Sequence, residues 1–185
     1  MQAQMEQMEQ RLREVEEKLG VMQANAPNDQ LSMVVFSGEL DRMLAAFIIA
    51  TGAAAMYDRV VMFFTFWATP ALKDAHKRVE KADMMARMFE WMLPRGADQL
   101  KLSRMNMAGA GTRMMKALMK KKGVMSLPEL MKAAADFGVE IVVCEMSMNL
   151  MGIHHEELID YPNISLAGAA KFLQEAGQSK ATLFI

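Results

Sequence analysis

The 185-residue sequence contains one cysteine, Cys144, and only three histidines. A single cysteine cannot form a disulfide within the chain, so a small secreted scaffold held together by disulfides is excluded. His154 and His155 follow Cys144 without the close ligand spacing of a structural zinc site, and we predict no bound metal. The segment AGAGT (108–112) does not follow the first predicted strand, so it does not match the dinucleotide-binding fingerprint, and we expect no cofactor.

The sequence also lacks a charge excess and a long apolar run. Its 21 basic and 22 acidic residues give a net charge of −1, which provides no electrostatic basis for binding nucleic acid or an anionic membrane. The most apolar window, residues 43–57, is shorter than the roughly 20 residues that a membrane-spanning helix needs. The N-terminus shows no leader with a charged and then an apolar region. We therefore expect a cytoplasmic protein without a membrane span and without a nucleic-acid partner.

The N-terminal residues show a heptad pattern. Apolar residues recur at alternating intervals of four and three: Met1, Met5, Met8, Leu12, Val15, Leu19 and Met22. This spacing is typical of the a and d positions of a coiled coil, and so short a helix is stable only if its apolar stripe meets a partner. The partner would be the rest of the same chain or a second copy, and the spacing favours a second copy. We predict a helical arm over residues 1–24, a linker over 25–30 and an α/β domain over 31–185.

The rest of the sequence alternates between strand-like and helix-like segments. Apolar runs predict strands at residues 31–37, 59–67, 139–144 and 181–185. Helical patterns occupy residues 39–56, 74–93, 111–123, 126–138 and about 166–176. Because strands that alternate with helices form parallel sheets covered on both faces, we predict a three-layer α/β sandwich with a mainly parallel sheet of about five strands.

The carboxyl ends of the predicted strands are the expected place for a site, because open parallel sheets bind ligands there. Three such ends can be identified, at Ser37-Gly38, Thr65-Phe66-Trp67 and Cys144-Glu145-Met146. If these strands are neighbours, Cys144 lies at the mouth of a cleft, and the start of the following helix favours its thiolate form. A free cysteine is, however, more often a buried and inert residue. The residues alone leave both interpretations open.

Four blocks of the sequence resemble the DsrE/DsrF-like family. They are MVVFSGELDRMLAAFIIATGAA (33–54), FFTFW (63–67), LSRMNMAGAGTRMMKALMKKKG (102–123) and CEMSMNLMGI (144–153). The resemblance covers about residues 31–185 and implies a small α/β fold, usually homo-oligomeric, that handles sulfane sulfur. It implies that Cys144 carries a persulfide or a thiosulfonate. It also implies partners of the rhodanese-like donor and TusA-type carrier classes, although some family members are labelled peroxiredoxin-like.

The single cysteine fits a sulfur carrier, because a neighbouring thiol would expel the carried sulfur by forming a disulfide. A two-cysteine peroxidase needs a resolving thiol, which only another subunit or a small thiol would supply here. We predict that Cys144 is the reactive residue and that its pocket is formed by Ser37, Gly38, Trp67, Met105, Asn106, Met146 and Ser147. The leading hypothesis is a sulfur carrier, sulfurtransferase-like if it is catalytic. The alternatives are a non-catalytic assembly or regulatory module with an inert cysteine, and a thiol-dependent peroxidase.

Overall fold

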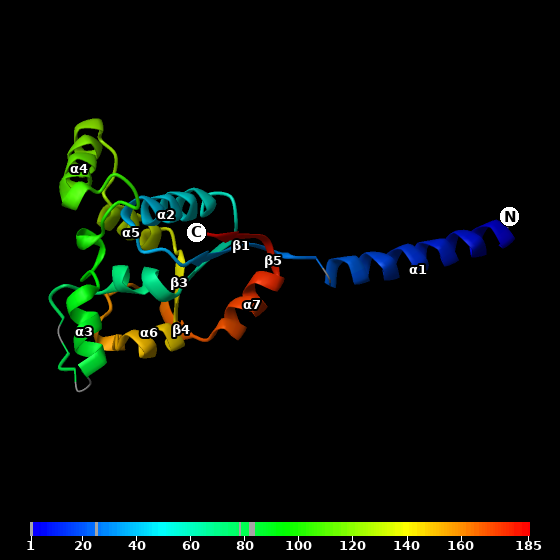
Figure 1. Cartoon of the computed structure of the whole chain (residues 1–185). Helices are drawn as coiled ribbons and strands as arrows, with labels where there is room; N and C mark the ends of the chain where they lie inside the picture. The colour runs from blue at the N-terminus through cyan, green and yellow to red at the C-terminus, as the bar shows by residue number, and fades with distance from the viewer. Residues whose placement is uncertain (1, 25, 78, 82–83) are drawn as a thin grey trace.

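The structure is a computed structural model that describes residues 2–24, 26–77, 79–81 and 84–185 (Figure 1). Its helices and strands, with the short 3-10 helices labelled η, are α1 (Gln2–Ala24), β1 (Asn28–Val35), α2 (Leu40–Ala53), β2 (Arg59–Phe64), η1 (Phe66–Leu72), α3 (Met84–Met92), η2 (Ala97–Gln99), η3 (Met107–Gly109), α4 (Ala110–Lys122), α5 (Leu127–Asp136), β3 (Glu140–Cys144), α6 (Glu145–Met151), η4 (His155–Glu157), β4 (Ile164–Ala167), α7 (Ala169–Gly177) and β5 (Ser179–Phe184).

The five strands form one parallel sheet in the order β4-β3-β2-β1-β5. Helices α2 and α5 cover one face of this sheet, and α6 and α7 lie on the other (Figure 1). The predicted three-layer α/β sandwich is thus confirmed. In the register of the central strands, Phe64 pairs with both Val35 and Val143, so the carboxyl ends of β1, β2 and β3 are level with one another.

The main core lies between the sheet and the α2–α5 layer. Its fully buried members include Met33, Met43, Phe47, Met62 and Phe64, and the flexible thioether of methionine fills the space between the branched and aromatic side chains. A smaller buried cluster on the opposite face consists of Val61, Phe63, Val142 and Cys144, with Ala167 and Phe172 packed against it. The thiol therefore lies on the face that α6 and α7 cover.

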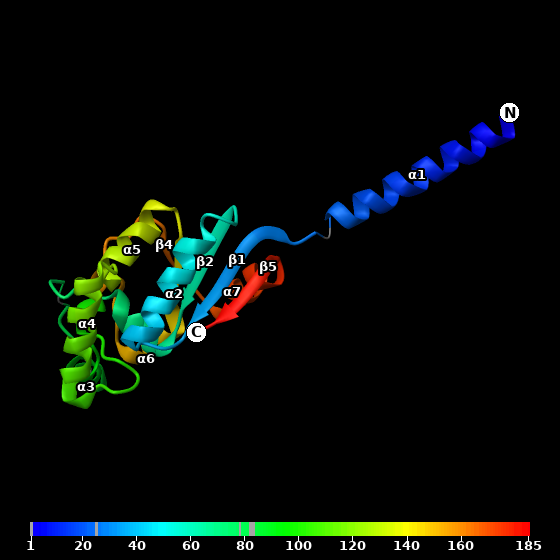
Figure 2. The same ribbon diagram turned by 90° about the horizontal axis from the view of Figure 1, so that it is seen from above.

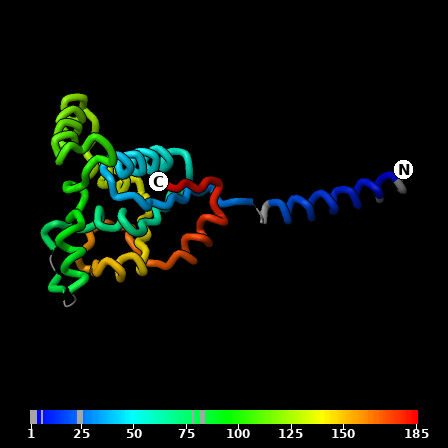
Figure 3. The backbone as a smooth tube through the Cα atoms, in the orientation of Figure 1, coloured from blue at the N-terminus to red at the C-terminus, as the bar shows by residue number. Residues whose placement is uncertain are grey.

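Helix α1 projects away from the sandwich, on the side opposite to α3 and α4 (Figures 1 and 2). The structure thus has a helix where the heptad pattern predicts one, and the backbone trace shows it as a separate arm joined to β1 (Figure 3). Met1, the first residue of the pattern, lies outside the described residues. Strand β1 begins at Asn28, inside the segment expected to be a linker. Pairing of the arm as a coiled coil concerns a second chain and stays a prediction.

Two of the predicted helix boundaries are wrong. Of the helix expected over residues 74–93, the structure has α3 at Met84–Met92, whereas residues 74–77 and 79–81 are not helical because their lysines bind elsewhere in the fold; residues 78, 82 and 83 lie outside the described residues. Lys77 Nζ donates to the Leu158 carbonyl at 2.9 Å and Lys81 Nζ to the Gly152 carbonyl at 2.6 Å. These bonds hold Lys77 and Lys81 against the backbone of Leu158 and Gly152, and the chain at these two lysines is not helical. The helix expected from about residue 166 is preceded by the short edge strand β4, and α7 begins at Ala169.

The described part of the chain contains no helix that is both long and apolar enough to cross a lipid bilayer.

Candidate functional site

Cys144 is the last residue of β3 and directly precedes α6. Strand β2 lies beside β3 with Phe64 opposite Val143, so the next residues along each strand, Thr65 and Cys144, are neighbours at the carboxyl edge of the sheet. The cysteine is only 3% exposed. Two strand ends and the first turn of α6 therefore enclose the thiol.

The surroundings of Cys144 favour its ionised form although it is buried. Burial raises the pKa of the thiol, but hydrogen bonds from the hydroxyl and the backbone N–H of Ser147, from the Thr65 hydroxyl and from the Met146 N–H outweigh burial and lower the pKa overall. The two hydroxyl oxygens are themselves 2.8 Å apart. Because the thiolate is the nucleophilic form of cysteine, this arrangement can support attack on sulfur.

A local backbone turn fixes Thr65 at this position. The Thr65 N–H donates to the Val35 carbonyl at 3.0 Å, and the Ala68 N–H donates to the Thr65 carbonyl at 3.2 Å. Phe66, the residue after Thr65, adopts a φ of 45°, a left-handed conformation that is uncommon for a bulky residue. Strain of this kind persists only where the surrounding structure holds it, and here it directs the chain away from β2 immediately after Thr65.

Helix α7 covers the side of the sheet that carries the thiol. Phe172 packs against the cluster that contains Cys144, and its ring centroid lies 5.2 Å from that of Phe63. Another molecule can reach the thiol only if α7 or the start of α6 moves, since Cys144 is almost fully buried.

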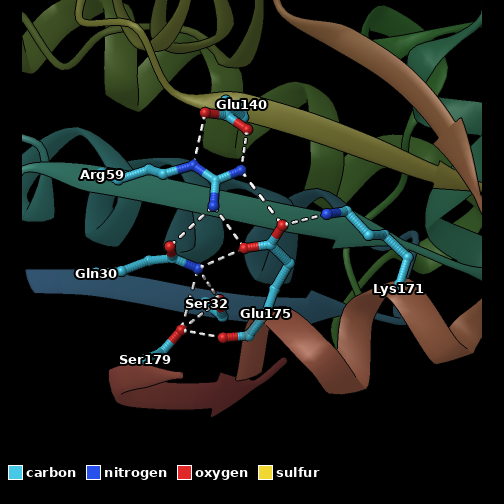
Figure 4. Close-up of polar contacts among 7 residues, drawn as sticks. All are labelled: Gln30, Ser32, Arg59, Glu140, Lys171, Glu175 and Ser179. Atoms are coloured by element: carbon cyan, nitrogen blue, oxygen red, sulfur yellow. Dashed lines mark hydrogen bonds and ion pairs between the residues drawn. The ribbon is translucent and has the colours of Figure 1, made fainter. Parts of the chain in front are cut away.

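A polar network connects the C-terminal end of α7 to the sheet (Figure 4). Arg59 donates to both oxygens of Glu140, at 2.7 and 2.6 Å, and to Glu175 of α7 at 2.5 Å. Gln30 Nε2 also donates to Glu175, at 3.1 Å. Burial raises the pKa of Glu175, but the bonds from Arg59, Lys171 and Gln30 outweigh it and lower that pKa to about 2. The carboxylate is therefore ionised, and its ion pair is intact at neutral pH.

The structure brings together only some of the predicted pocket residues. Ser147 and Met146 lie beside Cys144 through the hydrogen bonds described above, with the Met146 side chain largely exposed. Ser37 and Trp67 meet instead at the ends of β1 and β2, in an open hollow that also includes Arg42 and the C-terminal residue. Arg42 Nη1 donates to Ser37 Oγ at 2.7 Å.

The segment after β1 passes close to the segment after β2 at Gly38, and this position requires glycine. A Cβ atom at Gly38 would lie 2.0 Å from the Trp67 carbonyl oxygen, far inside any allowed contact. Only glycine permits the two backbones to approach so closely. The glycine turn and the aromatic residue are thus neighbours, as expected, but they contact each other instead of Cys144.

Met105 and Asn106 lie in the loop before α4, which is anchored near the start of α2. The Leu40 N–H donates to the Lys101 carbonyl at 2.8 Å, and Asn106 accepts a bond from the Thr112 hydroxyl at 2.8 Å. Among the described residues, no hydrogen bond joins this loop to Cys144. A Cβ at Gly111 would lie 1.8 Å from the Met105 carbonyl oxygen, so this glycine of the AGAGT segment serves close backbone packing.

Thr65 is the site residue that the sequence-based prediction omits. The strand end Thr65-Phe66-Trp67 is recognised, but the aromatic residue is chosen from it for the pocket. The available signal was the alternation of side chains along the strand, since Phe63 and Thr65 share a face and so do Val142 and Cys144. The choice depends on the register between β2 and β3, which the sequence does not state.

A second buried ionic cluster lies away from the thiol, beneath the segment that precedes α3. Glu157 is 1% exposed and contacts Lys73 Nζ at 3.2 Å and Lys81 Nζ. Burial raises the pKa of Glu157, and the bond from the His154 N–H together with the two lysines reverses this and lowers the pKa. Within the described ranges, no group of three or more histidine, cysteine or acidic residues is arranged to hold a metal ion.

Residues 27–184, which include the five strands of the sheet, are similar in sequence to known proteins. The model of the DsrE/DsrF/DrsH-like family matches residues 27–184. YrkE of Bacillus subtilis strain 168 is 44% identical over 154 residues, which cover 83% of this chain and 95% of that protein. The sulfur carrier protein DsrE2 of Allochromatium vinosum is 34% identical over 160 residues, which cover 84% and 98%. The crystal structure of the ychN protein from E. coli matches with a TM-score of 0.49 and 11% identity, over 85% of this chain and 99% of that one.

Proposed function

Because the chain belongs to the DsrE/DsrF/DrsH-like family, we propose that it is a sulfur carrier in which Cys144 holds sulfane sulfur and passes it to a partner thiol. The observation that carries this proposal is the placement of the single thiol among hydroxyl and amide donors from Thr65, Met146 and Ser147, which lowers its pKa. Identity of 34% to a protein named as a sulfur carrier supports the same role.

Loading is a transfer of one sulfur atom between two thiols. The Cys144 thiolate attacks the outer sulfur of a donor persulfide, R–S–SH. As the new S–S bond forms, the donor's S–S bond breaks, and the donor leaves as the thiolate RS⁻ with the bonding electrons. Cys144 then carries a persulfide, and the reaction needs no external oxidant or reductant.

Unloading repeats this step with the roles exchanged. An acceptor thiolate attacks the outer sulfur of the Cys144 persulfide, and the Cys144 thiolate is the leaving group. A thiol with a lower pKa leaves faster, so the hydrogen bonds from Ser147 and Thr65 assist release as well as loading. The partners of this cycle would be a rhodanese-like donor and a TusA-type acceptor, and the carrier would act as a homo-oligomer.

One observation favours a second function, a non-catalytic assembly or regulatory module. Cys144 is 3% exposed, and buried free cysteines are commonly inert. The carrier proposal therefore requires that α7 or the start of α6 opens at a cost well below that of global unfolding, whereas the assembly module has no such requirement.

The deciding experiment is intact mass after brief exposure of the folded protein to polysulfide and, separately, to tetrathionate. The matched control is Cys144→Ser, and a second sample of each is treated after denaturation. With tetrathionate, the thiolate attacks an inner sulfur and displaces thiosulfate, which leaves a thiosulfonate group on the cysteine. The two reagents therefore test loading of a persulfide and of a thiosulfonate separately, and the gain in mass tells the two groups apart.

The carrier proposal predicts an adduct on the folded wild type and none on Cys144→Ser, and a reducing thiol should remove this adduct. If the folded protein gains no mass but the denatured wild type does, the thiol is inaccessible and the assembly module is the better description. If peroxide instead forms a sulfenic acid on Cys144 and is turned over with an external reductant, the protein is a thiol-dependent peroxidase.

A further inference from the structure

Helix α1 presents an unpartnered apolar stripe to water. Its described members, here called the seam, are Met5, Met8, Leu12, Val15, Leu19 and Met22, and each is between 49% and 72% exposed. The helix points away from the α/β domain (Figures 1 and 2), so folding back onto that domain does not bury the seam in this structure. Most of the stability of a helix in a protein comes from packing of its apolar face, so a stripe of this kind favours a partner that covers it.

The seam assigns a heptad position to every residue of the arm. The intervals of four and three place Met5, Leu12 and Leu19 at position a, and Met8, Val15 and Met22 at position d. The g positions next to the seam are then basic or neutral: Gln4, Arg11 and Lys18. The e positions on the other side are acidic or neutral: Glu9, Glu16 and Gln23.

We propose that α1 is the docking surface for a second copy of this chain, and that the two α1 helices pair as a parallel, in-register coiled coil. In that arrangement each g residue faces the e residue of the next heptad on the partner helix. Arg11 then faces Glu16 of the second copy, twice by symmetry, and no like-charged pair arises. The charges on both sides of the seam are therefore complementary to a second copy of the same helix.

The same charges disfavour the antiparallel arrangement. Antiparallel helices place g residues opposite g residues and e residues opposite e residues. Basic side chains such as Arg11 and Lys18 would then face one another, and so would Glu9 and Glu16. Like charges at these positions oppose pairing, so the sequence selects the parallel form.

Parallel pairing has a consequence for the α/β domains. Both domains are held at the same end of the coiled coil, because β1 begins at Asn28, only a few residues after the last seam residue. A short tether of this kind gives the two domains a high effective concentration, in the millimolar range for short flexible linkers. The arm lies outside the region that the family model matches, so this assembly device is additional to the shared fold.

The test uses cysteine trapping in the full-length chain with Cys144→Ser, which removes the only native thiol. Met8→Cys places a thiol at position d, where a parallel in-register partner presents the same residue. Glu17→Cys places a thiol at position f, on the outer side of the helix, and is the matched control. We expect the interchain disulfide at Met8→Cys to form at least tenfold faster under mild oxidation than at Glu17→Cys. Equal rates at the two positions would overturn the proposal.

A third variant, Leu19→Cys, reports orientation. An antiparallel pair would bring residue 8 of one helix opposite residue 19 of the other, so a mixture of the two variants would form a mixed disulfide faster than either variant forms its own. The parallel arrangement predicts the reverse. Since these substitutions lie in the arm and Cys144 is already absent, the result is independent of sulfur loading.

Charge reversal tests the pairing of Arg11 with Glu16, with the Met8→Cys disulfide as the readout. Arg11→Glu and Glu16→Arg should each slow this disulfide about tenfold, because each creates two like-charged pairs. Mixing the two variants recreates two attractive pairs and should restore a mixed disulfide at the original rate. Glu17→Arg, with the same charge change at position f, should have little effect. If the mixture remains slow, the parallel register is wrong.

Discussion

Replacement of Glu175 by glutamine is expected to expose Cys144, because this carboxylate fastens α7 over the thiol. A carboxyl group whose pKa falls from 4.5 to about 2 has its ionised form stabilised by about 3 kcal/mol. Its partner Arg59 is 39% exposed, so water weakens the pair. We therefore expect the substitution to weaken the docking of α7 by about 2 kcal/mol.

The assay is the rate at which an aromatic disulfide reagent modifies Cys144 at pH 7 in the folded protein. A loss of about 2 kcal/mol corresponds to a roughly 30-fold larger open population, and thus to roughly 30-fold faster labelling if α7 must move first. Glu140→Gln is the matched control, because it removes the other carboxylate bound to Arg59 but lies on β3 and leaves the α7 pair in place. Equal labelling of wild type and Glu175→Gln would refute the idea that α7 is the cover.

The pH dependence follows from the same ion pair. The pKa of Glu175 is lower in the folded chain than its ordinary value, so the pair stabilises the fold above about pH 4.5, and this contribution is lost as the pH falls toward 2. The amide exchange protection factors of α7 should decrease over this range in the wild type. In Glu175→Gln they should already be low at neutral pH and should change less with acid.

Three further substitutions test other parts of the structure. Ser147→Ala should raise the pKa of the Cys144 thiol, because it removes the hydroxyl that stabilises the thiolate; the absorbance of the thiolate as a function of pH measures this. Glu157→Gln should lower the free energy of unfolding by about 3–5 kcal/mol in urea denaturation, because it leaves buried ammonium groups without a counter-charge. Gly38→Ala should cost about 2 kcal/mol or more, since the added methyl group would overlap the Trp67 carbonyl.

Each stability prediction has a control of the same chemical type. Asp160→Asn removes a carboxylate that pairs with Lys77 at the surface, where its side chain is 92% exposed, and should change the free energy of unfolding by less than about 1 kcal/mol. Gly177→Ala adds a methyl group where no atom lies within 4 Å and should be tolerated. If Asp160→Asn destabilises the fold as much as Glu157→Gln, burial of the ion pair is not the cause of the loss. If Gly177→Ala destabilises it as much as Gly38→Ala, the close contact with the Trp67 carbonyl is not the cause.

The fold was predictable where local chemistry and the apolar pattern agree. Helix α5 begins as expected, with Ser126 and Glu129 forming a reciprocal capping box, and Gly123 ends α4 with a φ of 69°. Strand β4 was not predictable, because it has only four residues and lies at the sheet edge, so its sequence ISLA is too short to show a clear strand pattern. The late start of α3 depends on lysine bonds to a loop that lies more than 70 residues further along the chain.

The local part of the candidate site could likewise be predicted from the sequence, and the part that depends on strand order could not. Cys144 and Ser147 come from one strand end and the turn that follows it, so their proximity is a local property. Ser37 follows the end of β1, which is separated from β3 by β2, so it starts about 10 Å from Cys144 at a strand spacing of roughly 4.8 Å. The strand order decides which residues meet, and no local pattern encodes that order.

The burial of Cys144 is compatible with two functions that require opposite properties of the cover. A carried persulfide reacts with any thiol that reaches it, so a carrier benefits from a closed cover that opens locally when a partner binds. An inert structural cysteine needs no local opening at all. The urea dependence of Cys144 labelling separates these cases: local opening exposes little surface and gives a rate almost insensitive to low urea, whereas global unfolding gives a rate that rises steeply. If the labelling rate of Cys144 changes little with urea and is faster in Glu175→Gln, α7 covers the thiol and opens locally, as the carrier proposal requires.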